Sequence, residues 1–406
     1  MPTLSRQGSF LTAGLVAALA LWASAAPTVV YPLYASQWAL TTATTTAVFA
    51  VYPLVLVVTL IVFGNLSDSI GRRITILIGL GLLFAGSMAF AVAPELSWVF
   101  VGRALMGAGV GVALSPATAA MVEFARESSR ASSATTAATA GGLTLATLVG
   151  GAQVQYAPEP LHLTFWVLAI ACALGIGLAW FLPRHTVDPT ATRWRPRRPM
   201  VPQDGRIPFA AGTLGVSAAY SLGAIYLALG AQIARDLVGS PNVLLDGAVI
   251  ALSAVSIGVV AVLGRAIPAR TALIVGPLLA AAGLAALVVA GLQHSLTAFL
   301  VSSIIGGAGY SLMFAGGLGL ITAGAPARHR AMVLSAAYVI AYVLQAVTAF
   351  GLGLLVTSTG LQRAIEIGSP AVVLLGFAAL VLTRLHRPPT PIATDSRPRL
   401  LERTHP

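Results

Sequence analysis

The sequence predicts an all-α membrane protein in which twelve transmembrane helices form two pseudo-symmetric six-helix bundles. Three observations carry this prediction: the composition, the length of the apolar segments and an internal repeat. Of the 406 residues, 57% are hydrophobic and 9% are charged, whereas soluble domains carry roughly 25% charged residues. A soluble fold of this size needs a more polar surface, so the composition excludes an ordinary soluble enzyme and a disordered chain.

Apolar segments follow one another along the whole chain. Each has about 17–28 residues, enough to cross a hydrocarbon core of about 30 Å at about 1.5 Å per helical residue. The segments are unbroken, whereas the strands of a membrane barrel alternate apolar and polar residues, so we expect helices. In chain order the twelve expected spans are 10–34, 44–66, 74–93, 98–123, 133–155, 163–182, 208–230, 245–266, 271–291, 296–323, 333–357 and 369–385.

The arginines predict which side of the membrane the chain starts from. All 23 basic residues are arginine, and 20 of them fall in loops and tails on one side if the N-terminus is inside. By the positive-inside rule both ends are therefore cytoplasmic, in a multi-pass protein of the cell inner (plasma) membrane. Arg195, Arg197 and Arg198 lie in the longest loop, where we expect anionic lipid headgroups as the partner rather than nucleic acid.

A loop rich in proline and arginine, without an apolar run, divides the chain after the sixth span. We expect an N-terminal six-helix bundle at 1–183, a basic cytoplasmic linker at 184–207 and a C-terminal six-helix bundle at 208–387. The remaining basic, proline-containing stretch, 388–406, is expected to be a disordered cytoplasmic tail.

The two halves resemble each other when one is shifted by about 200 residues. Glycine is abundant, so the most informative match is an Arg-Ala pair in the same short inner loop of each half. Two related six-helix bundles imply a binding site on the axis between them, near the bilayer midplane. The aligned positions are Gly107 with Gly307, Gly109 with Gly309, Arg130-Ala131 with Arg330-Ala331, Gly151 with Gly351 and, at an offset of 197, Arg73 with Arg270 and Gly79 with Gly276.

The loop after the second span carries a motif that resembles the signature loop of the major facilitator superfamily, Gly-x-Leu-x-Asp-Arg-x-Gly-Arg-Lys. Gly64 is expected to let two helices approach closely, and Gly71 to allow a tight turn with positive φ. The resemblance implies the fold of that superfamily and a latch that holds the halves in the outward-facing state. Ser69 departs from the motif, where a basic residue is usual. The latch residues implied are Gly64, Asp68, Gly71, Arg72 and Arg73.

The fourth span is similar to that of the drug:proton antiporters in the same superfamily, which carry an arginine followed by spaced glycines. Arg103 is the arginine here. An arginine inside a span costs about 2.5–3.5 kcal/mol on insertion scales, so it should face a cavity or a partner, or else extend to the headgroups. The fifth span differs from the antiporter pattern, because Ala146-Thr147 replace its Gly-Pro. This departure favours an importer or facilitator as the alternative.

Polar and aromatic residues inside the spans are candidates for lining the central cavity. Tyr338, Tyr342 and Gln345 share one helix face in span eleven. Such faces suit an amphipathic or moderately apolar organic ligand. Tyr31, Tyr34 and Trp38 near the outer end of span one are expected in the interfacial belt instead. The cavity candidates are Trp22, Tyr220, Tyr226, Tyr310, Tyr338, Tyr342 and Gln345.

Acidic residues that could carry a proton are scarce. Asp246 begins span eight and Glu123 ends span four, and with Arg103 they are the candidates for proton coupling. We therefore expect a secondary transporter that exports a small organic or drug-like molecule against proton entry, with a small-metabolite importer or facilitator as the alternative. No catalytic cluster, metal-ligand spacing or cofactor motif is found, so no enzyme, metal or cofactor is expected. The family resemblance implies a monomer.

Overall fold

The structure is a computed structural model that describes residues 3–125, 128–183, 200–202, 205–237, 239, 242–325 and 330–385. Side chains are described for these ranges except 128–133 and 331. The expected tail at 388–406 and most of the expected linker at 184–207 lie outside the described residues.

Twelve helices in the described ranges are long and apolar enough to cross a membrane, which confirms the expected number of spans. The first six consist of α1 (Arg6–Ala25) continued by η1 (Ala26–Val29) and α2 (Tyr31–Gln37), then α3 (Thr42–Phe63), α5 (Arg72–Ala91), α6 (Leu96–Phe124), α7 (Ser128–Tyr156) and α8 (Pro160–Ala179), with the short α4 (Leu66–Ile70) before α5. The other six consist of α9 (Arg206–Ala224) continued by η2 (Ile225–Leu229), α10 (Gly230–Gln232) and η3 (Ile233–Leu237), then α11 (Val243–Leu263) with η4 (Gly264–Ala266), α12 (Ala269–Leu292), α13 (Leu296–Gly324), α14 (Arg330–Thr359) and α15 (Leu361–Leu385).

The last span begins earlier than the apolar run indicates. We expect it from residue 369, but α15 starts at Leu361, so Arg363 and Glu366, expected in an outer loop, lie on the helix. The Gln362 amide donates a hydrogen bond of 2.8 Å to the Glu366 carboxylate one turn later. Such i,i+4 pairs extend a helix beyond its apolar part, into a region where the hydropathy pattern no longer marks it.

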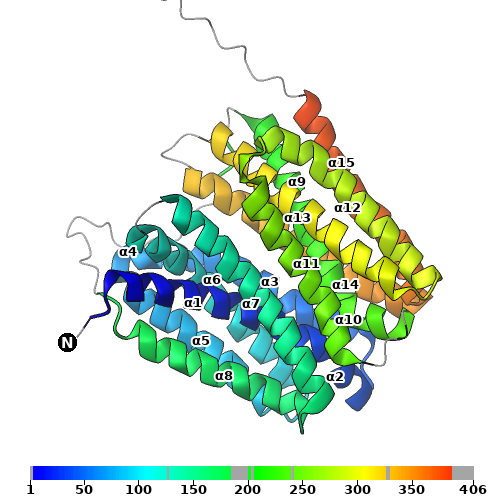
Figure 1. Ribbon diagram of the computed structural model, residues 1–406, viewed down its shortest axis with the longest axis horizontal. Coiled ribbons are helices and arrows are strands. Elements are labelled where there is room, and N and C mark those ends of the chain that lie inside the picture. Colours follow the sequence, from blue (N-terminus) through cyan, green and yellow to red (C-terminus); the bar gives the residue numbers. More distant parts are fainter. Residues whose placement is uncertain are drawn as a thin grey trace, which may run out of the picture.

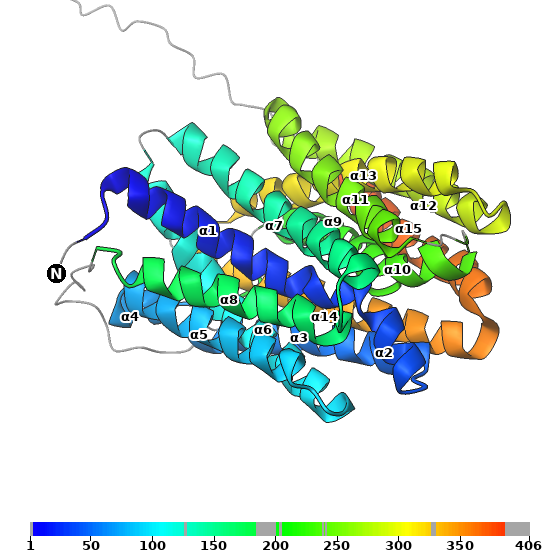
Figure 2. The same ribbon diagram turned by 60° about the horizontal axis from the view of Figure 1, so that its bottom comes forward.

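Two bundles form one molecule, with the first six spans in one bundle and the last six in the other (Figure 1). The described chain begins at α1 and ends at α15 on one side, here called the terminal side, where α4 also lies; α2 lies at the opposite, distal side (Figure 2). Between the bundles, α7 packs against α11 and α3 packs against α14. The α3–α14 pair and the α7–α11 pair therefore hold the two halves together, and the central axis runs between these two pairs.

Pseudo-symmetry between the bundles is visible in matched glycine contacts. An ideal Cβ at Gly109 on α6 would lie 2.9 Å from the carbonyl oxygen of Gly79 on α5. Its counterpart at Gly309 on α13 would lie 3.0 Å from the carbonyl oxygen of Gly276 on α12. Both sites leave no room for a side chain, so glycine lets each helix pair approach at the same relative position. The repeat in the sequence thus corresponds to a repeat in the packing.

Candidate functional site

A cavity of about 410 Å³ lies between the two bundles. It reaches Gly64, which caps the terminal-side end of α3, and Leu334, near the terminal-side start of α14. The helices that border it are α3 and α6 from the first bundle and α9, α13 and α14 from the second. Its lining residues are Leu56, Leu60, Gly64, Val110, Gly111, Leu114, Ser115, Thr118, Tyr220, Phe314, Leu334, Ser335, Tyr338 and Tyr342. We call it the terminal-side cavity.

On the distal side the same two helices, α3 and α14, are in contact. The backbone N–H of Ala43 donates a hydrogen bond of 3.1 Å to the hydroxyl of Thr357. The Thr42 hydroxyl bonds the Gln232 amide of α10 at 3.4 Å. One turn further in, Gly353 on α14 has no space for a Cβ because of Thr46 on α3. The bundles are therefore separated at their terminal-side ends and joined at their distal ends.

Four of the tyrosines predicted to line a cavity come together at the inner end of the terminal-side cavity. The hydroxyl groups of Tyr220 and Tyr342 are 3.3 Å apart, and their ring centroids are 4.6 Å apart. Tyr310 stacks on the Tyr220 ring at a centroid distance of 6.3 Å, and Tyr338 is 6.3 Å from Tyr342. Phe314, which sequence analysis does not single out, stacks on Tyr220 at 5.8 Å. We call these five residues the aromatic cluster.

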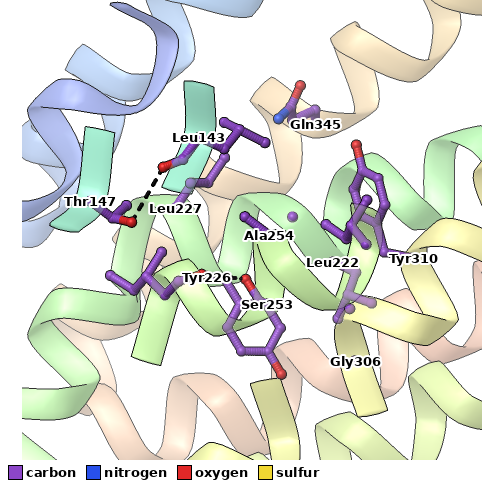
Figure 3. A pocket seen from close by; sticks show the side chains of 14 residues that line it. Leu143, Thr147, Leu222, Tyr226, Leu227, Ser253, Ala254, Gly306, Tyr310 and Gln345 are labelled. Carbon is purple, nitrogen blue, oxygen red and sulfur yellow. Dashed lines mark hydrogen bonds between the residues drawn. The ribbon is translucent and has the colours of Figure 1, made fainter. Parts of the chain in front are cut away.

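A second, smaller cavity of about 60 Å³ lies at mid-depth, bordered by α7, α9, η2, α11, α13 and α14 (Figure 3). Three members of the predicted set line it, namely Tyr226, Tyr310 and Gln345, and Tyr310 also belongs to the aromatic cluster. Most of its remaining wall is aliphatic. The lining residues are Leu143, Thr147, Leu222, Gly223, Tyr226, Leu227, Ile250, Ser253, Ala254, Ile257, Gly306, Gly307, Tyr310 and Gln345. We call it the mid-depth cavity.

Trp22 and Tyr226 differ from the other predicted cavity residues. The Tyr226 hydroxyl is bonded within the second bundle, to the carbonyl oxygen of Ser302 at 2.9 Å and to its hydroxyl at 2.6 Å, so only the rest of its side chain faces the cavity. Trp22 packs, half-buried, against the core of the first bundle and lines neither of the two cavities.

Arg103 is fully enclosed in the first bundle, at 1% exposure, and does not extend to the headgroups. Its Nη1 donates a hydrogen bond of 2.9 Å to the carbonyl oxygen of Ser24. The guanidinium carbon lies 4.8 Å from the ring centroid of Tyr52, 5.6 Å from that of Phe49 and 6.0 Å from that of Tyr31. These distances allow cation–π attraction, so aromatic faces and one carbonyl surround this charge.

The aromatic enclosure of Arg103 corrects one expectation. Tyr31 and Tyr34 are expected in the interfacial belt, but both are buried, at 4% and 3% exposure. η1 and α2 fold these rings into the first bundle, where Tyr34 stacks on Trp38 at 4.8 Å and lies 6.4 Å from Phe90. The sequence offers one signal for this enclosure, because Phe49 and Tyr52 are three residues apart and share a face of α3.

The two acidic candidates for proton coupling lie in different environments. Asp246 is in the first turn of α11 and is 1% exposed. Glu123, near the terminal-side end of α6, has 35% of its side chain exposed and forms an ion pair with Arg72. Glu123 is therefore joined to the motif loop, whereas Asp246 is a carboxyl group enclosed by protein at the contact between the bundles.

The motif loop contacts the rest of the first bundle through Arg72, which pairs with Glu123, and through Arg73. Arg73 donates a hydrogen bond of 3.4 Å to the carbonyl oxygen of Leu182, and its guanidinium lies 5.4 Å from the Trp180 ring centroid. Asp68 accepts a hydrogen bond of 3.4 Å from the neighbouring serine. Gly71 has the expected positive φ, at 85°. Beside this loop the end of α3 and the start of α14 line the terminal-side cavity, so the two bundles are apart at this position.

Gly64 acts differently from the expectation. A Cβ there would meet the carbonyl oxygen of Leu60 in its own helix, and no neighbouring helix lies close. The residue caps α3 and borders the cavity, so its smallness serves the helix end and not a helix–helix approach.

Comparisons with known proteins agree with this architecture. Residues 13–211 match the Major Facilitator Superfamily. A segment of 138 residues, 34% of the chain, is 33% identical to the inner membrane transport protein YajR of Escherichia coli (strain K12), and a segment of 67 residues, 16% of the chain, is 39% identical to polyol transporter 5 of Arabidopsis thaliana. These matches span 30% and 12% of the relatives' own lengths.

Solved structures of transporters share the fold over nearly the whole chain. A peptide transporter, POT, in complex with sulfate superposes with a TM-score of 0.77 at 17% identity, over 96% of this chain and 98% of its own. The nucleoside transporter NupG (D323A mutant) does so with a TM-score of 0.74 at 14% identity, over 92% and 99%. The family and fold are those of transporters and not of enzymes, as the sequence indicates. With twelve spans in two related bundles, the signature loop and the match over residues 13–211, the chain is similar to members of the major facilitator superfamily and has the fold of the solved transporters.

Proposed function

We propose that the protein is a secondary active transporter that moves a small organic molecule across the membrane by alternating access. The observation that carries this proposal is the cavity of about 410 Å³ between the bundles, which reaches the terminal-side ends of α3 and α14 while their distal ends are hydrogen-bonded. A site between two related bundles that is open to one side at a time is what rocking of the halves requires.

The terminal side is proposed to be cytoplasmic, in the plasma membrane. The arginine distribution supports this orientation, and the relative from Escherichia coli is named as an inner membrane protein. In this orientation the structure corresponds to an inward-facing state. The latch role of the motif loop then predicts that Asp68 and its neighbours meet the second bundle only after the terminal-side cavity closes.

Export against proton entry is the proposed direction, with Asp246 as the proton-carrying group and Arg103 as a fixed positive charge. The similarity of span four to the antiporters supports export. Asp246 suits coupling because a buried carboxyl group that is alternately enclosed and wetted changes its protonation with conformation. The alternative is an importer or facilitator of a small metabolite, favoured by the altered fifth span and by the short match to a polyol transporter.

Cysteine pairs test alternating access directly, in a background in which Cys172 is replaced by serine. One pair, Ala43→Cys with Thr357→Cys, lies across the distal contact, and the other, Leu60→Cys with Leu334→Cys, lies across the terminal-side cavity. We expect the distal pair to cross-link readily in the resting protein and the terminal pair to react with a water-soluble thiol reagent. Cross-linking of both pairs at the same rate, with no effect of one on the other, would contradict two alternating states.

Inside-out vesicles with an imposed proton gradient test the direction. Export against proton entry predicts that a transported compound accumulates in vesicles with an acidic interior, and that Asp246→Asn removes the accumulation but leaves downhill exchange. If the compound instead reaches equal concentrations on both sides of the membrane with or without the proton gradient, the result would support a facilitator. Matched vesicles with the cross-linked distal pair serve as the control for leakage.

A further inference from the structure

The walls of both cavities are electrically neutral. None of the described residues that line the terminal-side or the mid-depth cavity is acidic or basic. A charged ligand would lose its hydration there without meeting an opposite charge, which is costly in a confined site. The chemistry of the cavities can therefore be read from their hydroxyl, amide and aromatic groups.

Most polar groups around the mid-depth cavity already have partners in the protein. The Thr147 hydroxyl donates to the carbonyl oxygen of Leu143 at 3.3 Å, and the Ser253 hydroxyl donates to that of Ile250 at 2.7 Å. Tyr226 is bonded away from the cavity, as described above. The protons of the Thr147 and Ser253 hydroxyl groups are therefore occupied, and toward a ligand these groups can act only as acceptors.

Gln345 is the exception. Its side chain is 9% exposed, and its buried Oε1 accepts no hydrogen bond within the described part of the chain. It lies at the same edge of the drawn cavity as the phenol of Tyr310, whereas the phenol of Tyr226 turns to the opposite edge (Figure 3). A carboxamide carries both donors and an acceptor, and rotation of the amide exchanges their places. A buried amide oxygen without a partner requires an explanation, and a ligand in the adjoining cavity supplies one.

Arg103 adds a positive potential on the side of the first bundle. Among the described side chains, no carboxylate lies within ion-pair distance of Arg103, and the ion pair found there joins Arg72 and Glu123. Tyr342 of the aromatic cluster packs against the same core that contains Phe49 and Tyr52, so the enclosed charge and the aromatic cluster belong to one packed region. An unbalanced cation in a poorly polarisable region repels other cations over longer distances than in water.

We infer that the transporter takes an uncharged ligand whose amide or hydroxyl group enters the mid-depth cavity and pairs with the carboxamide of Gln345, while its apolar body lies on the aromatic cluster, and that organic cations are rejected. This inference rests on the proposed function and deepens it, because it names the charge class and the recognition group of the substrate. The neutral walls together with the charge of Arg103 explain why organic cations are rejected. The carboxamide of Gln345 explains why an uncharged ligand with an amide or hydroxyl group binds.

Three planar probes of nearly equal shape isolate the effect of charge: 2-naphthamide, which is neutral, 2-naphthoate, an anion, and 2-naphthamidine, a cation. Binding is measured by thermal unfolding, because a ligand of the folded state raises the melting temperature. Cys172, the one cysteine in the sequence, is buried, so a thiol-reactive dye reports unfolding. We expect 2-naphthamide to bind at least 10-fold more tightly than either charged probe.

Two substitutions test the role of Gln345. Gln345→Leu keeps the volume and removes the amide, so binding of 2-naphthamide should weaken about 5- to 10-fold while 2-acetylnaphthalene, which lacks a donor, changes less. Gln345→Glu should reverse the preference, because a carboxylate pairs with an amidinium, and 2-naphthamidine should become the tightest of the three probes. A matched control, Gln362→Leu, lies on the distal end of α15 and should leave all three affinities unchanged.

Several results would overturn the inference. Equal or tighter binding of 2-naphthamidine by the unsubstituted protein would refute rejection of cations, and no stabilisation by any probe would refute this ligand class. If Gln345→Glu left the order of the three probe affinities unchanged, the Gln345 amide would have no role in ligand recognition. The cysteine-pair experiment distinguishes these failures from failure of the proposed function, because alternating access can hold for a ligand of another class.

Discussion

Replacement of Arg103 by methionine separates the two reasons why a charge can be buried, stability and function. The structure allows the effect on stability to be worked out. The hydrogen bond from the guanidinium to the carbonyl oxygen of Ser24 contributes about 1.5–3 kcal/mol, and the ring contacts, the shortest at 4.8 Å to Tyr52, add about 0.5–2 kcal/mol. Against this, burying the arginine costs about 2.5–3.5 kcal/mol.

These contributions nearly cancel, so we expect Arg103→Met to change the free energy of unfolding by no more than about 2 kcal/mol. Transport, in contrast, should fall to background, because the fixed positive charge is lost. The assay is thermal unfolding followed through Cys172, paired with flux in vesicles, and Arg103→Lys is the matched variant that keeps a charge. A variant that fails to fold would refute the energetic reasoning, and unchanged flux in a folded variant would refute the functional role.

Four further substitutions test the remaining parts of the site. Gly247→Val should destabilise the protein by about 1–3 kcal/mol through overpacking, because a Cβ there would overlap a backbone carbonyl of α7. Gly177→Val is the control, because nothing lies within 4 Å of a Cβ at that position. Equal melting temperatures of the two variants would contradict a close contact between the bundles. Arg72→Gln and Glu123→Gln should each lower the free energy of unfolding by less than about 1 kcal/mol, since about a third of each side chain is exposed. Both should nevertheless alter the ratio of inward-facing to outward-facing states, measured by cysteine accessibility. Asp246→Asn should abolish gradient-driven accumulation while the exchange rate without a gradient persists, and retained accumulation would exclude this carboxyl group as the proton carrier.

The spans are predictable from sequence because hydropathy records the environment that a segment crosses. The face that each helix turns to the interior is much harder to predict. A helix between lipid and protein is apolar all round, so the contrast between faces that marks soluble helices is absent. Tyr220 and Tyr342 are identifiable as candidates because a phenol is unusual at mid-depth, whereas Phe314 in the same aromatic cluster is not distinguishable from lipid-facing phenylalanines.

Residues near the ends of spans show the same difficulty in another form. Tyr31 and Tyr34 have the composition and position of an interfacial belt, and only the fold of η1 and α2 shows that the rings turn inward. Proline at position 27 signals a break in the first span, but not its direction. The burial of Arg103 depends on that direction, since Tyr31 forms part of its enclosure. Sequence can therefore nominate the charge but not the groups that surround it.

The distal contact between the bundles also involves irregular helical segments. The first span contains the short 3₁₀ segment η1, and its pseudo-symmetric counterpart, the seventh span, contains the π-helical segments η2 and η3. η1 packs against both η2 and α10. Irregular backbone is tolerated at membrane depth only where protein or a cavity surrounds it, and π segments occur frequently at functional sites. In the proposed transport cycle, opening toward the distal side separates η1 from η2 and α10. The same segment η2 carries Tyr226 and Leu227 to the wall of the mid-depth cavity, so the wall of that cavity and the distal contact share one helical segment.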